Sequence, residues 1–221
     1  MKTLASVVGI GLLLSVGGAR AQSDSALQSD PRGWLDLLPG VSLRGWTRVP
    51  IPPGKAPDPV SQWKVDPVNR FLVCEGTGGH EWLRYDREFT DFIFHVEWRF
   101  TKRAGAKGYN SGIFVRNSAD GVLWHQAQVG AGSGGFLFGD TLRDGAKQHI
   151  NLSSQLKENR VKEAGEWNTY ELRCKAKTVT VWVNGAVTSE CTACDVPTGY
   201  VGLEAEGYRI EFRNLMLKEL P

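Results

Sequence analysis

Residues 91–101 read DFIFHVEWRFT, and apolar and polar side chains alternate along this stretch. A period of two is typical of a β-strand, because successive side chains point to opposite faces of a sheet. The apolar residues that share one face are Phe92, Phe94, Val96, Trp98 and Phe100. That face is therefore expected to pack into a core.

The same alternation recurs further along the chain and predicts an all-β domain. Residues 169–175 and 179–184 form a second pair of strands, and Asn184-Gly185 after them is a strong signal for a type I′ hairpin. Residues 200–205 and 209–218 form a third pair. Short antiparallel strands of this kind close most readily into a two-sheet antiparallel β-sandwich, a jelly roll in which one sheet curves to form a groove.

The first residues have the order of a cleavable secretory signal. Lys2 precedes an apolar run, and the small-residue pattern Ala19-Arg20-Ala21 follows that run. The run is shorter than the roughly 20 apolar residues of a transmembrane helix, so no membrane anchor is expected. We predict a secreted or periplasmic protein with residues 1–21 as the signal, 22–32 as a flexible leader and 33–221 as one domain.

Charge excludes two classes of partner. The chain has 26 basic and 24 acidic residues, and loss of the signal removes only Lys2 and Arg20, which leaves the two signs equal. A nucleic-acid-binding protein would carry a basic surplus, and a membrane-surface protein would carry a basic amphipathic helix. Neither nucleic acid nor a membrane surface is therefore an expected partner.

The four cysteines are Cys74, Cys174, Cys191 and Cys194. An oxidising compartment permits disulfides, and four cysteines allow three pairings among which the sequence does not choose. The Cys191-Thr-Ala-Cys194 spacing lacks the two further nearby ligands that a zinc site needs. Either a structural bridge or buried thiols are expected.

Two segments interrupt the strand pattern. Residues 50–59 are rich in proline, which lacks the N–H that a sheet requires, and they are predicted to form a loop. Residues 140–165 are polar and weakly periodic. Long loops in compact domains are often functional, so this second segment is predicted to be an insertion at the border of the groove, with a short helical turn near residues 155–161.

Alternation also sorts the polar side chains by face, and several of them are expected to line the curved sheet on the side turned away from the core. They fall on four strands: Glu97 with Arg99, Phe114 with Arg116, Trp124 with Gln126 and Gln128, and Glu204 with Glu206. This mixture suits a sugar, whose hydroxyls take planar polar partners while its C–H faces stack on rings. For Glu97 and Arg99, an ordinary ion pair on a solvated face is an equally good interpretation.

Glu204 and Glu206 lie two residues apart on one strand, so their charges repel unless a cation, an arginine or a shared proton separates them. Arg116 or Arg209 would serve, and so would a bound ion. No cofactor is required by the sequence, but a divalent metal ion such as calcium is one candidate for this place.

A set of short motifs occurs in a fixed order along the domain: FLVCEG at 71–76, WLR at 82–84, EWR at 97–99, NSGIF at 110–114, QAQ at 126–128, GEWNTY at 165–170, VNG at 183–185, GLEAEG at 202–207 and FRNL at 212–215. In this order the chain resembles the 3-keto-disaccharide hydrolase family over about residues 33–220. The resemblance implies a concanavalin A-like jelly roll, usually exported, that acts on glycosides whose sugar carries a ketone at carbon 3.

The resemblance also implies a mechanism, in which the ketone acidifies the C2 proton, a base removes it, the glycosidic oxygen leaves, and water adds afterwards. By this resemblance Glu206 or Glu97 is the base, and the other, or His125, is the acid. Arg116 and Gln128 would hold the keto oxygen or hydroxyls. His125 alternates away from Gln126 along its strand. Further substrate contacts are expected from Arg99, Asn110, Trp124 and Gln126.

One position pair departs from the family pattern. Related sequences often have Glu where Gln126 stands and Gln where Glu204 stands. A Gln cannot accept a proton at neutral pH, so either this member binds sugars without cleaving them or Glu204 takes over from across the groove.

Three hypotheses follow: an exported enzyme that cleaves 3-keto-glycosides, a non-catalytic lectin-like carbohydrate-binding domain, or a structural extracellular domain whose concave face is filled by residues 140–165.

Overall fold

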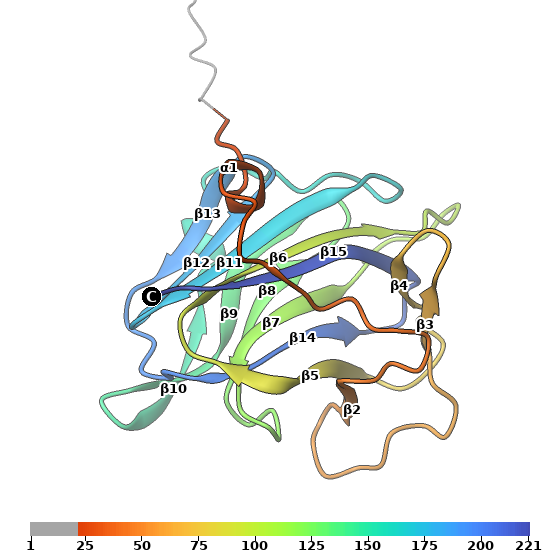
Figure 1. Cartoon of the computed structure of the whole chain (residues 1–221), viewed down its shortest axis with the longest axis horizontal. Coiled ribbons are helices and arrows are strands. Elements are labelled where there is room, and N and C mark those ends of the chain that lie inside the picture. Colours follow the sequence, from red (N-terminus) through yellow and green to blue (C-terminus); the bar gives the residue numbers. More distant parts are fainter. Residues whose placement is uncertain (1–21) are drawn as a thin grey trace, which may run out of the picture.

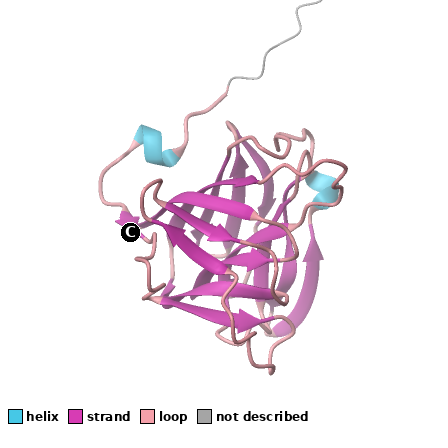
Figure 2. Cartoon of the chain, turned by 90° about the vertical axis from the view of Figure 1, so that its right-hand side faces the viewer, coloured by secondary structure: helices cyan, strands magenta, loops and turns pink. Residues whose placement is uncertain are grey.

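Two antiparallel sheets stack face to face in the computed structural model, which describes residues 22–221 (Figures 1 and 2). The signal predicted for residues 1–21 lies outside the described residues. Among residues 22–221, no helix combines the length and the apolar character needed to cross a membrane.

The larger sheet has eight strands in the order β13-β12-β11-β6-β15-β4-β3, with β1 paired to β15. Their bounds are β1 Leu35–Asp36, β3 Trp63–Asp66, β4 Phe71–Cys74, β6 Phe92–Phe100, β11 Asn168–Lys175, β12 Thr178–Val183, β13 Ala186–Cys191 and β15 Ile210–Glu219.

The smaller sheet has seven strands in the order β10-β9-β8-β7-β14-β5-β2. Their bounds are β2 Trp46–Pro50, β5 Glu81–Phe89, β7 Ser111–Asn117, β8 Trp124–Val129, β9 Gly134–Arg143, β10 Ala146–Asn151 and β14 Gly199–Ala205.

The core lies between the sheets, and β6 shows how alternation builds it. The five apolar residues expected on one face of this strand are all buried: Phe92, Phe94, Val96, Trp98 and Phe100. Burial of such large side chains stabilises each by about 1.5–3 kcal/mol relative to exposure. The predicted fold is confirmed: the chain is a two-sheet antiparallel β-sandwich with a jelly-roll architecture.

The hairpin predicted at Asn184-Gly185 is confirmed. Val183 of β12 pairs with Ala186 of β13, which leaves a two-residue loop. Asn184 has a φ of 44° and Gly185 a φ of 106°, and positive φ at both positions is what a type I′ turn requires.

The prediction for residues 140–165 was wrong in part, because residues 140–151 form a hairpin instead of a loop. Arg143 of β9 pairs with Ala146 of β10 across a two-residue turn, Asp144-Gly145, in which both φ values are positive. The polar composition hid these strands, since β10 is an edge strand whose side chains, Ile150 excepted, are exposed. The helical turn expected near 155–161 is instead a 3₁₀ turn, η1, at Ser153–Gln155.

The segment predicted to be a flexible leader packs against the outer face of the eight-stranded sheet. Its helical turn, α1 (Ala26–Ser29), begins with a capping box in which Ser25 and Gln28 bond each other's backbone. The buried carboxylate of Glu171 on β11 accepts hydrogen bonds from the N–H groups of Ala26 at 2.7 Å and Leu27 at 3.1 Å. A carboxylate at a helix N-terminus satisfies donors that composition alone does not reveal.

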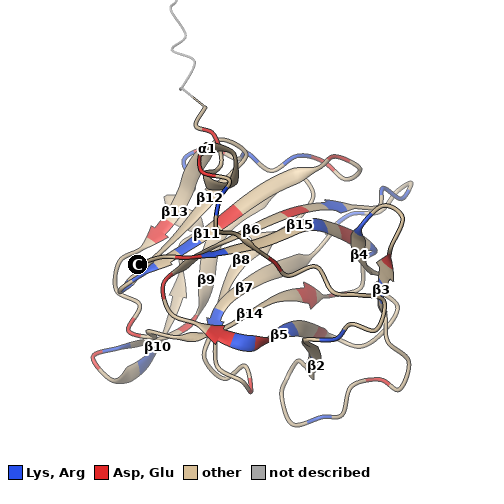
Figure 3. Ribbon diagram, viewed as in Figure 1, with Lys and Arg blue, Asp and Glu red and all other residues tan. Residues whose placement is uncertain are grey.

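Of the two cysteine arrangements left open by the sequence, the structure has buried thiols. Cys74, Cys174, Cys191 and Cys194 are all free and buried. Burial raises the pKa of the Cys74 thiol to about 12. Basic and acidic residues are mixed over both sheets in Figure 3, where neither sign forms a continuous stripe.

Candidate functional site

A groove of about 440 Å³ is hollowed into the outer face of the seven-stranded sheet. Its walls come from β5, β7, β8, β9 and β14, from the loop after β2 and from the loop between β7 and β8. The lining residues are Pro50, Ile51, Pro53, His80, Trp82, Asn110, Phe114, Asn117, Asp120, Gly121, Trp124, Gln126, Gln128, Phe138, Glu204 and Glu206.

Two glycines make the floor of the groove flat. A Cβ atom at Gly112 on β7 would collide with the side chain of Gln126, and one at Gly202 on β14 would collide with the ring of Trp82. Without side chains at these positions, the amide and the indole ring lie down against the sheet.

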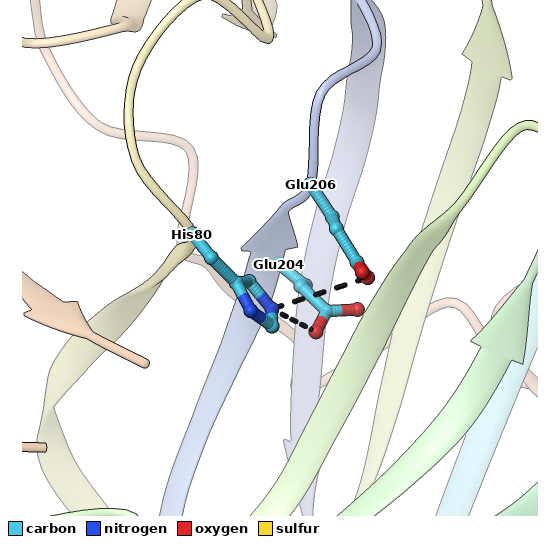
Figure 4. A group of neighbouring side chains, drawn as sticks. All are labelled: His80, Glu204 and Glu206. Atoms are coloured by element: carbon cyan, nitrogen blue, oxygen red, sulfur yellow. Dashed lines mark hydrogen bonds and ion pairs between the residues drawn. The ribbon is translucent and has the colours of Figure 1, made fainter. Parts of the chain in front are cut away.

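One end of the groove holds two carboxylates and an imidazole, and we call it the polar end (Figure 4). Glu204 accepts hydrogen bonds from His80 Nε2 and from Gln126 Nε2, both at 2.8 Å. Glu206 lies farther out and accepts a hydrogen bond from Asn110 Nδ2 at 2.5 Å. Asn110 in turn accepts one from Gln128 Nε2 at 2.6 Å. Each amide therefore aligns the next group in the network.

The pKa values of His80 and Glu206 are both raised within this cluster. The hydrogen bond to Glu204 raises the pKa of His80, and the charge of Glu206 adds to that effect. Partial burial raises the pKa of Glu206, and so does the nearby charge of Glu204. One imidazole nitrogen and one oxygen of each carboxylate lie within 4.8 Å of one another, so the three groups can share a proton or a cation.

The backbone around His80 is fixed by the proline-rich loop that follows β2. The N–H of Ile51 donates to the carbonyl of His80 at 2.9 Å. Asp58 accepts a hydrogen bond from the N–H of Gly79 at 2.7 Å, and Gln62 Nε2 donates to the Gly79 carbonyl at 2.8 Å. The loop therefore positions the imidazole.

A buried ion pair joins this loop to the residue after His80. Glu81 accepts hydrogen bonds from Arg48 Nε at 2.9 Å and Nη2 at 2.8 Å, and from Gln62 Nε2 and Trp63 Nε1, both at 3.1 Å. Arg48 also donates to the carbonyl of Asp58 at 2.7 Å. We call this network the Arg48–Glu81 clamp.

The other end of the groove is aromatic. Trp124 meets Phe138 edge-on, with ring centroids 5.2 Å apart, and Trp82 meets Phe114 at 5.5 Å. Trp124 and Phe138 are half-buried, whereas Trp82 and Phe114 are buried.

Six of the ten residues predicted to act in catalysis or substrate binding line the groove: Asn110, Trp124, Gln126, Gln128, Glu204 and Glu206. They come from β8, from β14 and its end, and from the approach to β7, which are neighbours in the seven-stranded sheet. Their assigned roles in catalysis and binding stay predictions.

Glu97 and Arg99 were expected in the groove, but they lie on the opposite sheet. They belong to β6, where Glu97 accepts hydrogen bonds from Arg213 and Asn214 and Arg99 donates to Glu211, each at 2.7 Å. Burial would raise the pKa of Glu97, but His95, Asn214 and Arg213 lower it to about 2. Such a carboxylate is a poor base, and the ion-pair interpretation is the one that the structure supports.

Arg116 was also expected in the groove, but a bulge turns it away. On β14, Tyr200 and Gly202 face Asn117 and Phe114 of β7, so two residues of β7 oppose one of β14. Arg116 has a φ of 50°, and parity changes after it. Asn117 therefore lines the groove in its place.

The buried guanidinium of Arg116 holds loops together instead of binding substrate. It donates to the carbonyls of Thr90, Ala176 and Val196 and pairs with Asp91 at 2.9 Å.

His125 lies in the core, on the far side of the sheet from the groove, in keeping with its alternation away from Gln126. Its Nδ1 lies 3.2 Å from the Val115 carbonyl, and its Nε2 lies 3.3 Å from the sulfur of Cys194. Burial lowers its pKa to about 4. It cannot touch a sugar in the groove, so its predicted role as the acid was wrong.

His80 is the residue of the polar end that the sequence analysis missed. It precedes β5 by one position, after Gly78 and Gly79, and shares the parity of Trp82. Extending the alternation of β5 backward by two residues would have placed it on the groove face.

Residues 33–218 match the profile of the family described as the 3-keto-alpha-glucoside-1,2-lyase-like domain. The chain belongs to this family. The resemblance seen in the ordered motifs is thereby confirmed, and family membership indicates a domain that acts on or binds carbohydrate. A comparison with curated protein sequences finds no significant match.

Solved structures similar to this member of the family share its fold. A candidate glycosyl hydrolase from Parabacteroides distasonis has a TM-score of 0.60 at 15% identity, over 90% of this chain and 100% of that one. A second one from the same organism has a TM-score of 0.55 at 18% identity, over 85% and 99%. A carbohydrate-binding module from Bacillus subtilis has a TM-score of 0.56 at 12% identity, over 79% and 96%.

The Arg48–Glu81 clamp is expected to be a large contributor to stability. Glu81→Gln leaves the guanidinium of Arg48 buried without its partner, which should lower the free energy of unfolding by about 3 kcal/mol. Glu219→Gln is the matched control, because it removes a carboxylate from the exposed ion pair with Arg87 and should cost under about 1 kcal/mol. Denaturant unfolding measures both, and equal losses would contradict the clamp.

Acidification from pH 7 to pH 5 is expected to cost about 2 kcal/mol of stability through His125. Its pKa is about 4 in the folded protein, against an ordinary value of 6.5. Between these values the unfolded chain binds more protons, so stability falls as the pH falls. In denaturant unfolding, His125→Gln should lose about 2 kcal/mol less than the parent over this interval. The same pH slope in both proteins would argue against a neutral buried imidazole.

Proposed function

We propose that this groove cleaves glycosides whose sugar bears a ketone at carbon 3, and that it does so outside the cytoplasm, in keeping with the pattern of residues 1–21. The observation that supports cleavage most directly is the polar end of the groove. There a half-exposed carboxylate, Glu206, lies beside an imidazole that a second carboxylate orients. Family membership supports the keto-sugar.

The chemistry needs one base and one group that stabilises negative charge. The ketone at carbon 3 acidifies the proton on carbon 2, and Glu206 accepts that proton. The electrons of the C2–H bond pass to the oxygen at carbon 3 as an enolate. As the ketone re-forms, the C1=C2 double bond forms and the C1–O bond breaks, and the glycosidic oxygen departs with the electron pair and takes up the proton that Glu206 holds. Water then adds at carbon 1 as a proton returns to carbon 2.

Each remaining polar group has a part in this scheme. His80, oriented by Glu204, offers positive charge to the oxygen at carbon 3 as the enolate forms. Gln128 and Asn110 bind hydroxyls and hold the Glu206 carboxylate in place. Trp82 and Phe114 pack on each other and support the floor of the groove from below.

Despite the departure from the family pattern, the contact between Gln126 and Glu204 supports an enzyme over a lectin-like domain. Gln126 and Glu204 are hydrogen-bonded to each other at 2.8 Å. A member with Glu at 126 and Gln at 204 would place the same carboxylate and amide together with their positions exchanged. The site therefore keeps its buried acid, and a carbohydrate-binding role without cleavage is the alternative outcome of the test below.

Glu206→Gln is expected to lower kcat for a 3-keto-disaccharide by about 10²–10⁴-fold, because it removes the base. Release of the leaving sugar measures turnover, and thermal unfolding checks that the variant is folded. Glu97→Gln is the matched control on the opposite sheet and should turn over like the parent. Loss of activity in Glu97→Gln alone would contradict the assignment. A parent protein that binds unmodified sugars in calorimetry without any turnover would establish the lectin-like function instead.

We further propose that His80 and Glu204 can hold a divalent metal ion beside Glu206. One imidazole with carboxylates suits a transition metal better than Ca²⁺, which takes six to eight oxygen ligands. Bound there, such an ion would polarise the ketone oxygen as a Lewis acid.

After treatment with a chelator, Mn²⁺ or Co²⁺ should raise the midpoint of thermal unfolding, and Ca²⁺ should raise it less. The stabilisation should approach about 3 kcal/mol at a metal concentration 100 times Kd. His80→Ala should abolish this shift, whereas His149→Ala, which removes an exposed imidazole paired with Asp140, should retain it. An equal shift in both variants would place the ion elsewhere.

A further inference from the structure

The groove lining changes from polar to aromatic along β8. Gln128, Gln126 and Trp124 all line the groove from this one strand. Four residues of strand span about 13 Å, which is room for a sugar ring and a second group beside it. The reacting sugar belongs at the Gln128 end, next to Glu206, so the leaving group extends toward Trp124.

The surface that meets the leaving group consists of rings. In register, Gln126 pairs with Phe138 and Phe114, and Trp124 lies one step farther from the carboxylates. Trp124 and Phe138 are both half-buried, and their rings lie edge to face at an interplanar angle of 88°. Such a corner accepts a flat ring by stacking on one member and edge contact with the other.

Two polar oxygens at this end accept hydrogen bonds from within the protein. Asn117 Oδ1 accepts a hydrogen bond from the N–H of His125 at 2.9 Å. Asp120 Oδ1 accepts from the Ser118 hydroxyl at 2.6 Å and from the N–H of Val122 at 3.0 Å. A second sugar would lay several hydroxyls against the rings of Trp124 and Phe138, and polar groups are costly to bury without partners.

We propose that the aromatic end of the groove is a leaving-group subsite for an aryl ring, so that aryl 3-keto-glycosides are preferred substrates. This inference rests on the proposed function. In the reaction the C2–H and C1–O bonds break and the C1=C2 bond forms. The aryloxy oxygen keeps the electron pair of the C1–O bond and takes up a proton to give a phenol. Trp124 contacts the aryl ring and determines specificity without taking part in proton transfer.

The test compares kcat/KM for three 3-keto-glucosides that differ only in the leaving group: phenyl, methyl and glucosyl. Trp124→Ala should lower the phenyl-to-methyl ratio of kcat/KM about tenfold, the loss expected for one aromatic pair. Intrinsic leaving ability cancels, because each substrate is compared between two proteins. The phenyl-to-glucosyl ratio should fall in the same direction. Trp167→Ala, which removes an indole that packs against Arg99 and Phe71 of the opposite sheet, should leave both ratios unchanged.

Outcomes separate the subsite from the reaction. Turnover with unchanged ratios in Trp124→Ala would overturn the aryl subsite and leave the proposed function standing. No turnover of any substrate by the parent would overturn the proposed function, and calorimetry with unmodified phenyl and methyl glucosides then tests the subsite alone. Tighter binding of the phenyl glucoside, lost in Trp124→Ala, would support the subsite. Equal binding of the two glucosides would overturn it.

Discussion

The carboxylate of Glu204, buried on the groove face of the seven-stranded sheet, is the interaction around which the site is organised. A buried carboxylate is costly unless hydrogen-bond donors and positive charge compensate it. Gln126 on β8 donates one hydrogen bond to Glu204 across β7. His80 donates another, and its imidazole can carry positive charge. Because the imidazole precedes its strand, it needs independent support, which the Arg48–Glu81 clamp and the loop after β2 provide. The groups that act in the groove and the contacts that anchor the loop therefore belong to one hydrogen-bond network.

The resemblance implies that Glu and Gln are exchanged between positions 126 and 204, and such an exchange would have a simple physical basis. Two strands, β14 and β8, are separated by β7, on which Gly112 leaves room for the Gln126 amide to reach across. Either position can supply the acid while the other supplies the amide, since the pair presents one of each to the groove. What the exchange alters is the neighbour of the acid: at 204 it is the partner of His80 and stands two residues from Glu206.

Alternation within a strand was predictable from the sequence, but the sheet to which a strand belongs was not. Parity alone grouped Trp124 with Gln126 and Gln128, and Glu204 with Glu206, and both groups line the groove. Glu97 and Arg99 obey the same parity on a strand of the opposite sheet, a long-range pairing that local pattern does not carry. The prediction that Arg116 faces the groove was wrong because one inserted residue in β7 reverses the alternation of side chains. No signal in the composition marks that bulge. The Asp144-Gly145 turn was readable, but the exposed edge strand after it has no apolar alternation.

The loop between β2 and β3 can change in length and sequence without altering either β-sheet. It supplies Ile51 and Pro53 to one wall of the groove and fixes the backbone at His80, yet it lies outside the sheet that forms the floor. Lengthening or recomposing this loop would reshape the opening and re-aim the imidazole while both β-sheets keep their hydrogen bonds. Changes in this one loop would therefore let relatives act on different substrates while the β-sandwich stays the same.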